Sequence, residues 1–161
     1  MVLRVGDVAP AWAGTTAAGQ ALSFESFRGR PLVLYFYPKA GSTGCRVEAK
    51  EFARHYAEFE NAGVPIVGVS VDSVESQKRF SDDCQLPFPL VADRDQTIAR
   101  SYGVLGILGI AKRVTFWIGP GGVVEEVVAG LLPGPHVRTM VDRLGGSERS
   151  SGVATGDKAN D

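Results

Sequence analysis

A continuous apolar run at residues 31–37 does most to limit what this chain can fold into. The run reads PLVLYFY, in which six apolar side chains follow Pro31, and Pro38 comes directly after it. An unbroken apolar run of this length is typical of a strand that is buried on both faces. Strands of this kind occur in sheets that are covered by helices on each side. The run therefore predicts the centre of an α/β fold.

The segments that follow alternate between helix and strand patterns. A helix is predicted from about Cys45 to Ala62, because its apolar residues recur at 4-3-4-3 spacing before Gly63. The other predicted elements are a small N-terminal hairpin, strands at 65–71, near 90, at 114–118 and at 123–129, and helices at 73–83, 97–102 and 135–144. This order predicts an α/β fold with a mixed central sheet and helices on both faces.

Composition limits the domain organisation and the kinds of partner. A chain of 161 residues with 44% apolar residues is expected to form one packed domain, over residues 1–144. Residues 145–161 are rich in Gly, Ser and Asp and are expected to be a flexible tail. The balance of 17 basic and 18 acidic residues argues against a nucleic-acid partner. No apolar run reaches 18 residues, so no membrane span is expected.

The rarity of cysteine and histidine argues against a metal site or a disulfide framework. The cysteines are Cys45 and Cys84, and the histidines are His55 and His136, without the paired spacing of zinc ligands. No metal and no other cofactor is expected. With so few cysteines and no signal-peptide pattern, we expect a cytoplasmic location.

The junction between the strand at 31–37 and the helix at 45–62 is the best candidate for chemistry. Ligands of α/β proteins bind outside the carboxyl ends of strands, and a helix N-terminus offers free N–H groups and partial positive charge. Cys45 would lie in that first turn, where the thiolate is favoured, and Arg46 is next to it. Two alternatives remain open: Cys45 as an inert buried residue, and the Gly41–Gly44 loop as a phosphate cradle, although it lacks a following Lys-Ser/Thr.

The segment YFYPKAGSTGCRVEAKEF resembles the active-site segment of the peroxiredoxins, in particular the PrxQ or bacterioferritin-comigratory-protein branch. That branch opens a helix with Pro-x-x-x-Thr/Ser-x-x-Cys, here Pro38, Ser42 and Cys45. The segments VGDVAP, LPFPL, ARSYGV and RVTFWI resemble other parts of the family in the same order. The resemblance implies a thioredoxin-like fold and a thiol-dependent peroxidase that reduces hydrogen peroxide and organic hydroperoxides.

The resemblance also implies a role for each matching residue. Cys45 would be the peroxidatic nucleophile that becomes a sulfenic acid. Ser42 would offer its hydroxyl to the peroxide, and Arg113 would direct its guanidinium at the Cys45 thiolate and the peroxide. Glu48 would orient Arg113, and Pro38 would shield the pocket. The alternatives are that Ser42 only caps the helix, that Arg113 and Glu48 are solvated charges, and that Pro38 only ends a strand.

The fate of oxidised Cys45 depends on the second cysteine. Many PrxQ-like proteins carry a resolving cysteine five residues after the first, where this chain has Lys50. Other members place it in the next helix, as Cys84 is placed here, so the resemblance implies a Cys45–Cys84 disulfide that thioredoxin or a similar thiol reduces. The alternatives are a one-cysteine peroxidase with Cys84 as a core residue beside Phe80, and a non-catalytic binding module. A disulfide exchanger is disfavoured because no Cys-x-x-Cys occurs.

Three further features carry expectations. His55 is expected to face solvent in mid-helix, and His136 to open the last helix, so neither receives a catalytic role. The apolar segment at 103–110 could be a partner surface, a dimer patch or a lip over the active site. The chain is expected to be a monomer or a weak homodimer.

Overall fold

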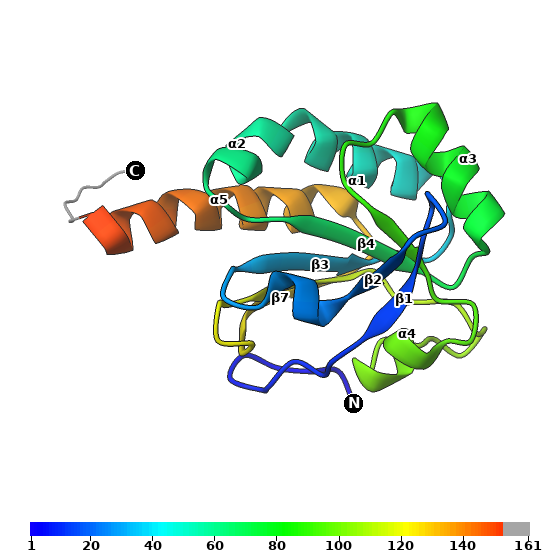
Figure 1. Cartoon of the computed structure of the whole chain (residues 1–161), viewed down its shortest axis with the longest axis horizontal. Helices are drawn as coiled ribbons and strands as arrows, with labels where there is room; N and C mark the ends of the chain where they lie inside the picture. Colours follow the sequence, from blue (N-terminus) through cyan, green and yellow to red (C-terminus); the bar gives the residue numbers. More distant parts are fainter. Residues whose placement is uncertain (153–161) are drawn as a thin grey trace.

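The computed structural model describes residues 1–152 and is built on one seven-stranded mixed sheet (Figure 1). The strand order is β2-β1-β5-β4-β3-β6-β7, which confirms the expected mixed α/β architecture. The strands are β1 (Ala13–Thr16), β2 (Ala21–Ser23), β3 (Leu32–Phe36), β4 (Ile66–Ser70), β5 (Leu90–Ala92), β6 (Val114–Ile118) and β7 (Val124–Ala129). The helices are a 3-10 turn (Phe24–Phe27), α1 (Thr43–Arg54), α2 (Tyr56–Asn61), α3 (Val74–Cys84), α4 (Thr97–Ser101) and α5 (Pro133–Gly152).

The central strand β3 is the buried apolar run that the sequence indicated. It pairs in parallel with β4 and antiparallel with β6, and all of its residues are buried. Because successive strand residues point to opposite faces, Leu34 and Phe36 join one apolar core cluster while Val33 and Tyr35 join another. Helix α4 packs on the first face, and α1, α2, α3 and α5 pack on the second (Figure 1). The expected N-terminal hairpin is also present, as the antiparallel pair β1–β2.

The helix predicted from Cys45 to Ala62 is interrupted. It starts at Thr43 and breaks at His55, whose backbone angles of φ −99° and ψ 7° separate α1 from α2. The His55 side chain is only partly exposed and pairs with Glu58 at 2.6 Å. The expectation of a solvent-facing mid-helix histidine was therefore wrong. Apolar spacing could not reveal the break, because Phe52 and Phe59 are buried on the same face across it.

The last helix is longer than the sequence predicted. It starts at Pro133, where the fixed φ of proline suits a first turn, and it continues through Gly152 rather than stopping near Leu144. Glycine lowers helix propensity by about 1 kcal/mol without forbidding a helix, so the Gly-Gly pair at 145–146 was a poor stop signal. The rest of the expected tail, 153–161, lies outside the described residues. Within residues 1–152, none of the helices has the length and apolarity needed to cross a membrane.

Candidate active site

Cys45 lies in the first turn of α1, directly after the loop that leaves β3. Its side chain is fully buried, and it belongs to the core cluster under α1. The N–H groups of Gly44 and Cys45 fall within the first residues of the helix, where no carbonyl lies one turn earlier to accept from them. They are therefore available to an anionic group beside the sulfur.

Arg113 brings a charge to this sulfur from a distant part of the chain. It directly precedes β6, and the pairing of Phe36 with Val114 places it beside the end of β3. Its Nη2 donates to Cys45 Sγ at 3.5 Å, and its Nε donates to the Leu131 carbonyl at 2.9 Å. Only 7% of Arg113 is exposed, so it is not a solvated charge.

Glycine at position 44 permits this close approach of the guanidinium. A Cβ atom at Gly44 would lie 3.0 Å from Arg113 Nη2. That distance is tighter than nine in ten real Cβ contacts, so with a larger residue the guanidinium would have to give way by a few tenths of an ångström. Gly44 thus has a steric role that the sequence motif alone did not reveal.

Glu48 completes the cluster one turn after Cys45. It is fully buried, its Oε1 accepts from Arg113 Nη1, and its Oε2 has no hydrogen-bond partner among the described residues. Burial raises the pKa of Glu48 to about 7, against the opposing effect of the Arg113 charge. The alternative of a solvated helix carboxylate is therefore wrong, and the structure brings Glu48, Arg113 and Cys45 together.

Ser42 lies in the loop that leads into α1, and Pro38 lines a groove that Arg113 also lines. Ser42 is the residue before α1, but its hydroxyl donates to the Lys39 carbonyl at 3.0 Å and makes no side-chain cap. Pro38 lines an open groove of about 630 Å³ together with Arg113 and residues 106–112. Ile107 and Leu108 are strongly exposed there, so the apolar segment lies beside Arg113.

Cys84 is the last residue of α3 and is half-buried. Arg46 Nη1 donates to Cys84 Sγ at 3.7 Å, and Arg46 Nε donates to the Gly41 carbonyl at 3.0 Å. One guanidinium therefore contacts both the loop before Cys45 and the second cysteine. Both cysteines are free thiols in this structure.

His136 is the residue of this region that the sequence analysis missed. It is fully buried in the first turn of α5, and its Nδ1 lies 3.9 Å from the unpartnered Glu48 Oε2. The sequence offered no acidic neighbour because Glu48 comes from another helix. The available signal was the spacing of His136, Met140 and Leu144, which places all of them on the inward face of α5.

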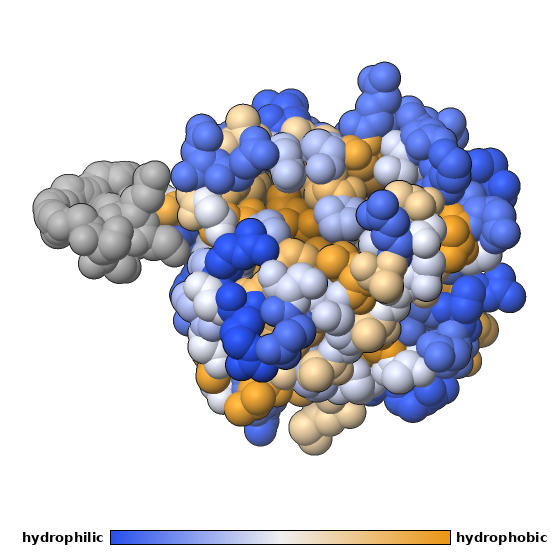
Figure 2. Space-filling view, in the orientation of Figure 1, coloured by the Kyte–Doolittle hydropathy of each residue, from blue (hydrophilic) through white to orange (hydrophobic). Residues whose placement is uncertain are grey.

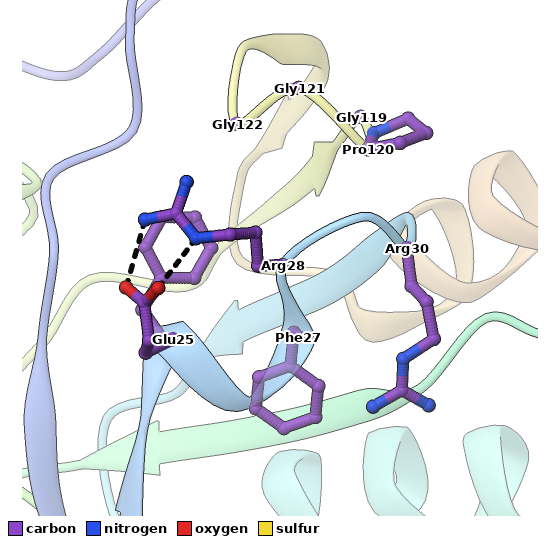
Figure 3. Close-up of a pocket in the computed structure, with 9 residues that line it drawn as sticks. Glu25, Phe27, Arg28, Arg30, Gly119, Pro120, Gly121 and Gly122 are labelled. Carbon is purple, nitrogen blue, oxygen red and sulfur yellow. Dashed lines mark hydrogen bonds and ion pairs between the residues drawn. The ribbon is translucent and has the colours of Figure 1, made fainter.

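A separate small cavity of about 120 Å³ lies near the 3-10 turn and the loop Gly119–Gly122 (Figure 3). Its Arg28 is directed at Glu25, with two hydrogen bonds between the side chains (Figure 3). None of its lining residues belongs to the Cys45 cluster. Within residues 1–152, no group of three or more His, Cys, Asp and Glu side chains is arranged to hold a metal ion.

A thioredoxin-like fold in which a cysteine at a helix start contacts a buried arginine defines a peroxiredoxin, a thiol-dependent peroxidase. The AhpC/TSA family profile matches residues 5–127, and the chain belongs to this family. It is 33% identical to peroxiredoxin Bcp of Escherichia coli strain K12 over 149 residues, which cover 88% of this chain and 96% of the relative. As in that family, its substrate is a peroxide and its reductant a thiol.

Solved structures agree with this family assignment. Peroxidoxin BcpB from Mycobacterium tuberculosis is similar with a TM-score of 0.84 and 29% identity, covering 89% of this chain and 97% of that one. The bacterioferritin comigratory protein of Xanthomonas campestris is similar with a TM-score of 0.79 and 30% identity, covering 84% of this chain and 91% of that one. The Xanthomonas protein has alkyl peroxide reduction activity.

Proposed function

We propose that Cys45 is the peroxidatic cysteine and that Arg113, Glu48, Ser42 and Pro38 form its peroxide pocket. The observation that carries this proposal is the 3.5 Å contact between Arg113 Nη2 and Cys45 Sγ inside a buried cluster. The thiolate is the nucleophilic form of cysteine, and a guanidinium at this distance can donate hydrogen bonds to it. The Glu48 carboxylate holds the other side of the same guanidinium.

The chemistry transfers one oxygen to the sulfur. The Cys45 thiolate attacks the terminal oxygen of the peroxide, the S–O bond forms as the O–O bond breaks, and the electron pair leaves with the second oxygen. The hydroperoxide proton goes to that leaving oxygen, which departs as water or an alcohol, and Cys45 is left as a sulfenate that takes up one proton from solvent to become the sulfenic acid. Arg113 and the free N–H groups of Gly44 and Cys45 are placed to stabilise the charge that develops on the oxygens.

We assign resolution to Cys84. The Cys84 thiol would lose its proton to solvent and attack the Cys45 sulfenic sulfur as a thiolate. The S–S bond forms as the S–O bond breaks, and the departing hydroxide takes up a proton and leaves as water. A disulfide requires Cα atoms within about 7 Å. Because Cys45 is fully buried, we propose that the first turn of α1 and part of α3 unwind as the bond forms. A dithiol reductant such as thioredoxin would then return both cysteines to thiols.

The setting of the reaction follows from the same features. The apolar groove beside Arg113 suits the organic part of an alkyl hydroperoxide as well as hydrogen peroxide. A cytoplasmic location fits two cysteines that must be kept reduced between turnovers. We propose a monomer or weak homodimer as the working form.

The direct test is the loss of hydrogen peroxide followed by stopped flow, with thioredoxin and its reductase as the electron source. Cys45→Ser is expected to abolish turnover because serine cannot form a sulfenic acid. Val47→Ala, at an exposed site in the same helix, serves as the control and should keep the wild-type rate. Peroxide turnover by Cys45→Ser would contradict the assignment, and reduction of insulin by the wild type would instead support a disulfide exchanger.

A further inference from the structure

Two successive backbone carbonyls in the turn between β7 and α5 accept hydrogen bonds from two different side chains. His136 Nε2 contacts the Gly130 carbonyl at 2.8 Å, and Arg113 Nε donates to the Leu131 carbonyl at 2.9 Å. We propose that His136 is a positioning residue for Arg113, acting through this turn. The proposal rests on the proposed role of Arg113 at Cys45.

The hydrogen-bond partners fix the state of the His136 ring. A carbonyl oxygen can only accept, so Nε2 carries the proton that it donates to Gly130. In the neutral ring, which burial favours, Nδ1 presents its lone pair, and the Thr115 hydroxyl donates to it at 2.8 Å. Both ring nitrogens are satisfied in the neutral form, and burial lowers the pKa of His136 in agreement with that form.

The turn itself is tied back to Arg113. The Gly130 N–H donates to the Arg113 carbonyl at 3.3 Å, so the turn contacts both the backbone and the side chain of this residue. Gly130 has a φ of 135°, which favours glycine and leaves the turn with little intrinsic preference for this shape. The bond from His136 therefore fixes the direction of the Leu131 carbonyl, and through it the Nε end of the guanidinium.

Because the His136 ring is neutral, it does not compete with Arg113 for the Glu48 carboxylate. The groups facing His136 are Thr115 on β6, the Glu48 carboxylate on α1 and the Arg113 charge. Because Nδ1 carries no proton, it cannot donate to Glu48 Oε2 at 3.9 Å. Among the described residues, Arg113 is then the side chain that donates to Glu48, and its Nη2 stays directed at Cys45.

A set of substitutions at position 136 tests this proposal. A glutamine amide can reach the place of Nε2 and donate to Gly130, whereas an asparagine amide is too short, and a phenylalanine ring keeps the volume without a donor. We expect His136→Gln to keep most of the rate constant for oxidation of Cys45 by hydrogen peroxide. His136→Asn and His136→Phe should lower it by roughly tenfold to a hundredfold, the range that misplacement of a catalytic group produces.

Stability is followed in parallel by urea unfolding. Val137→Ala, a buried change at the next position of α5, should lower stability without changing the peroxide rate constant, which separates positioning from loss of packing. Equal rate constants for the wild type and all His136 variants would overturn the proposal. The proposal would also be overturned if the rate constants of the His136 variants fell only in proportion to their stability, with His136→Gln no faster than His136→Asn. Failure of the proposed function is distinguishable, because Cys45→Ser would then still consume peroxide with His136 intact.

Discussion

At the scale of single residues, two opposing effects act on Glu48: burial disfavours its charged form, and the charge of Arg113 favours it. Glu48 is fully buried, and only one of its oxygens has a hydrogen-bond partner among the described residues. Desolvation therefore outweighs the attraction of Arg113 and raises the pKa of Glu48 to about 7. The folded protein binds this proton more tightly than the unfolded chain, in which a carboxyl of this kind titrates near 4.5.

The raised pKa of Glu48 predicts a fall in stability with rising pH. Between about 4.5 and 7 the unfolded chain has lost the proton while the folded protein keeps it, so the free energy of unfolding decreases as pH increases. The fall is up to roughly 3 kcal/mol and levels off above pH 7. Urea unfolding across this range should show that the wild type loses stability relative to Glu48→Gln as pH rises, because His136, whose pKa is lowered by burial, acts in the opposite direction in both proteins. Glu60→Gln, at an exposed site of α2, should behave as the wild type, and identical pH profiles for Glu48→Gln and the wild type would contradict the prediction.

Site residues that lie close together in the sequence were easier to predict than residues that only the fold brings together. Cys45 was singled out by its predicted place in the first turn of a helix, and Pro38 and Ser42 entered through a family motif that spans only this loop and helix turn. Arg113 was reached only through the family resemblance, and strand pairing explains how it meets Cys45. His136 could not be found in this way, because its partners Thr115 and Glu48 come from different elements and no local pattern connects them.

At the scale of secondary structure, the proposed resolution of oxidised Cys45 by Cys84 involves two helix ends. Cys45 begins α1 and Cys84 ends α3, and Arg46 connects these ends through Gly41 and Cys84. Helix ends are where local opening costs least, since their terminal backbone groups lack intrahelical partners. Both cysteines are therefore in places where a turn can unwind without disturbing the sheet.

Cys84→Ser tests the role of the α3 end. Mass spectrometry of the peroxide-treated wild type should find a Cys45–Cys84 disulfide. The variant should instead accumulate Cys45 as sulfenic acid and then as the irreversible higher acids, because no internal thiol intercepts it. Ser81→Ala, one turn earlier in α3, is the control and should form the disulfide normally. Unchanged turnover of Cys84→Ser with thioredoxin would remove Cys84 from the mechanism.

The elements themselves were predicted best where burial was continuous. The runs at β3, β4 and β6 are fully buried, and each was predicted as a strand from apolarity alone. The break at His55 and the far end of α5 were missed, because both depend on backbone geometry that side-chain polarity does not encode.

At the scale of the whole molecule, the groove beside Arg113 is an apolar opening in a surface that is otherwise mixed. On the face shown in Figure 2, hydrophilic residues cover much of the surface and hydrophobic residues appear between them. The exposed side chains of Ile107, Leu108 and Leu131 gather along the groove, which also reaches Pro38. Such clustering marks a binding region more than scattered exposure does.

The groove predicts a substrate-dependent effect of Leu108→Ser. Loss of this apolar contact should lower kcat/KM for cumene hydroperoxide by about tenfold, the usual value of one apolar contact. The value for hydrogen peroxide should stay unchanged, because that molecule has no organic part to bind. Val8→Ser, at an exposed apolar site outside the groove, should affect neither substrate. Equal losses for both peroxides would argue against a role of the groove in substrate selection.

The two outer strands of the sheet also have a consequence for the protein at high concentration. β2 is only three residues long, and β7 carries Glu125 and Glu126, which pair with Arg143, next to a register shift at Trp117 and Ile118. Short, charged and irregular borders of this kind offer a poor template to the backbone of another copy. Strand-by-strand growth into fibrils is thereby disfavoured, which would suit a protein in which, on the proposed mechanism, two helix ends open during each turnover.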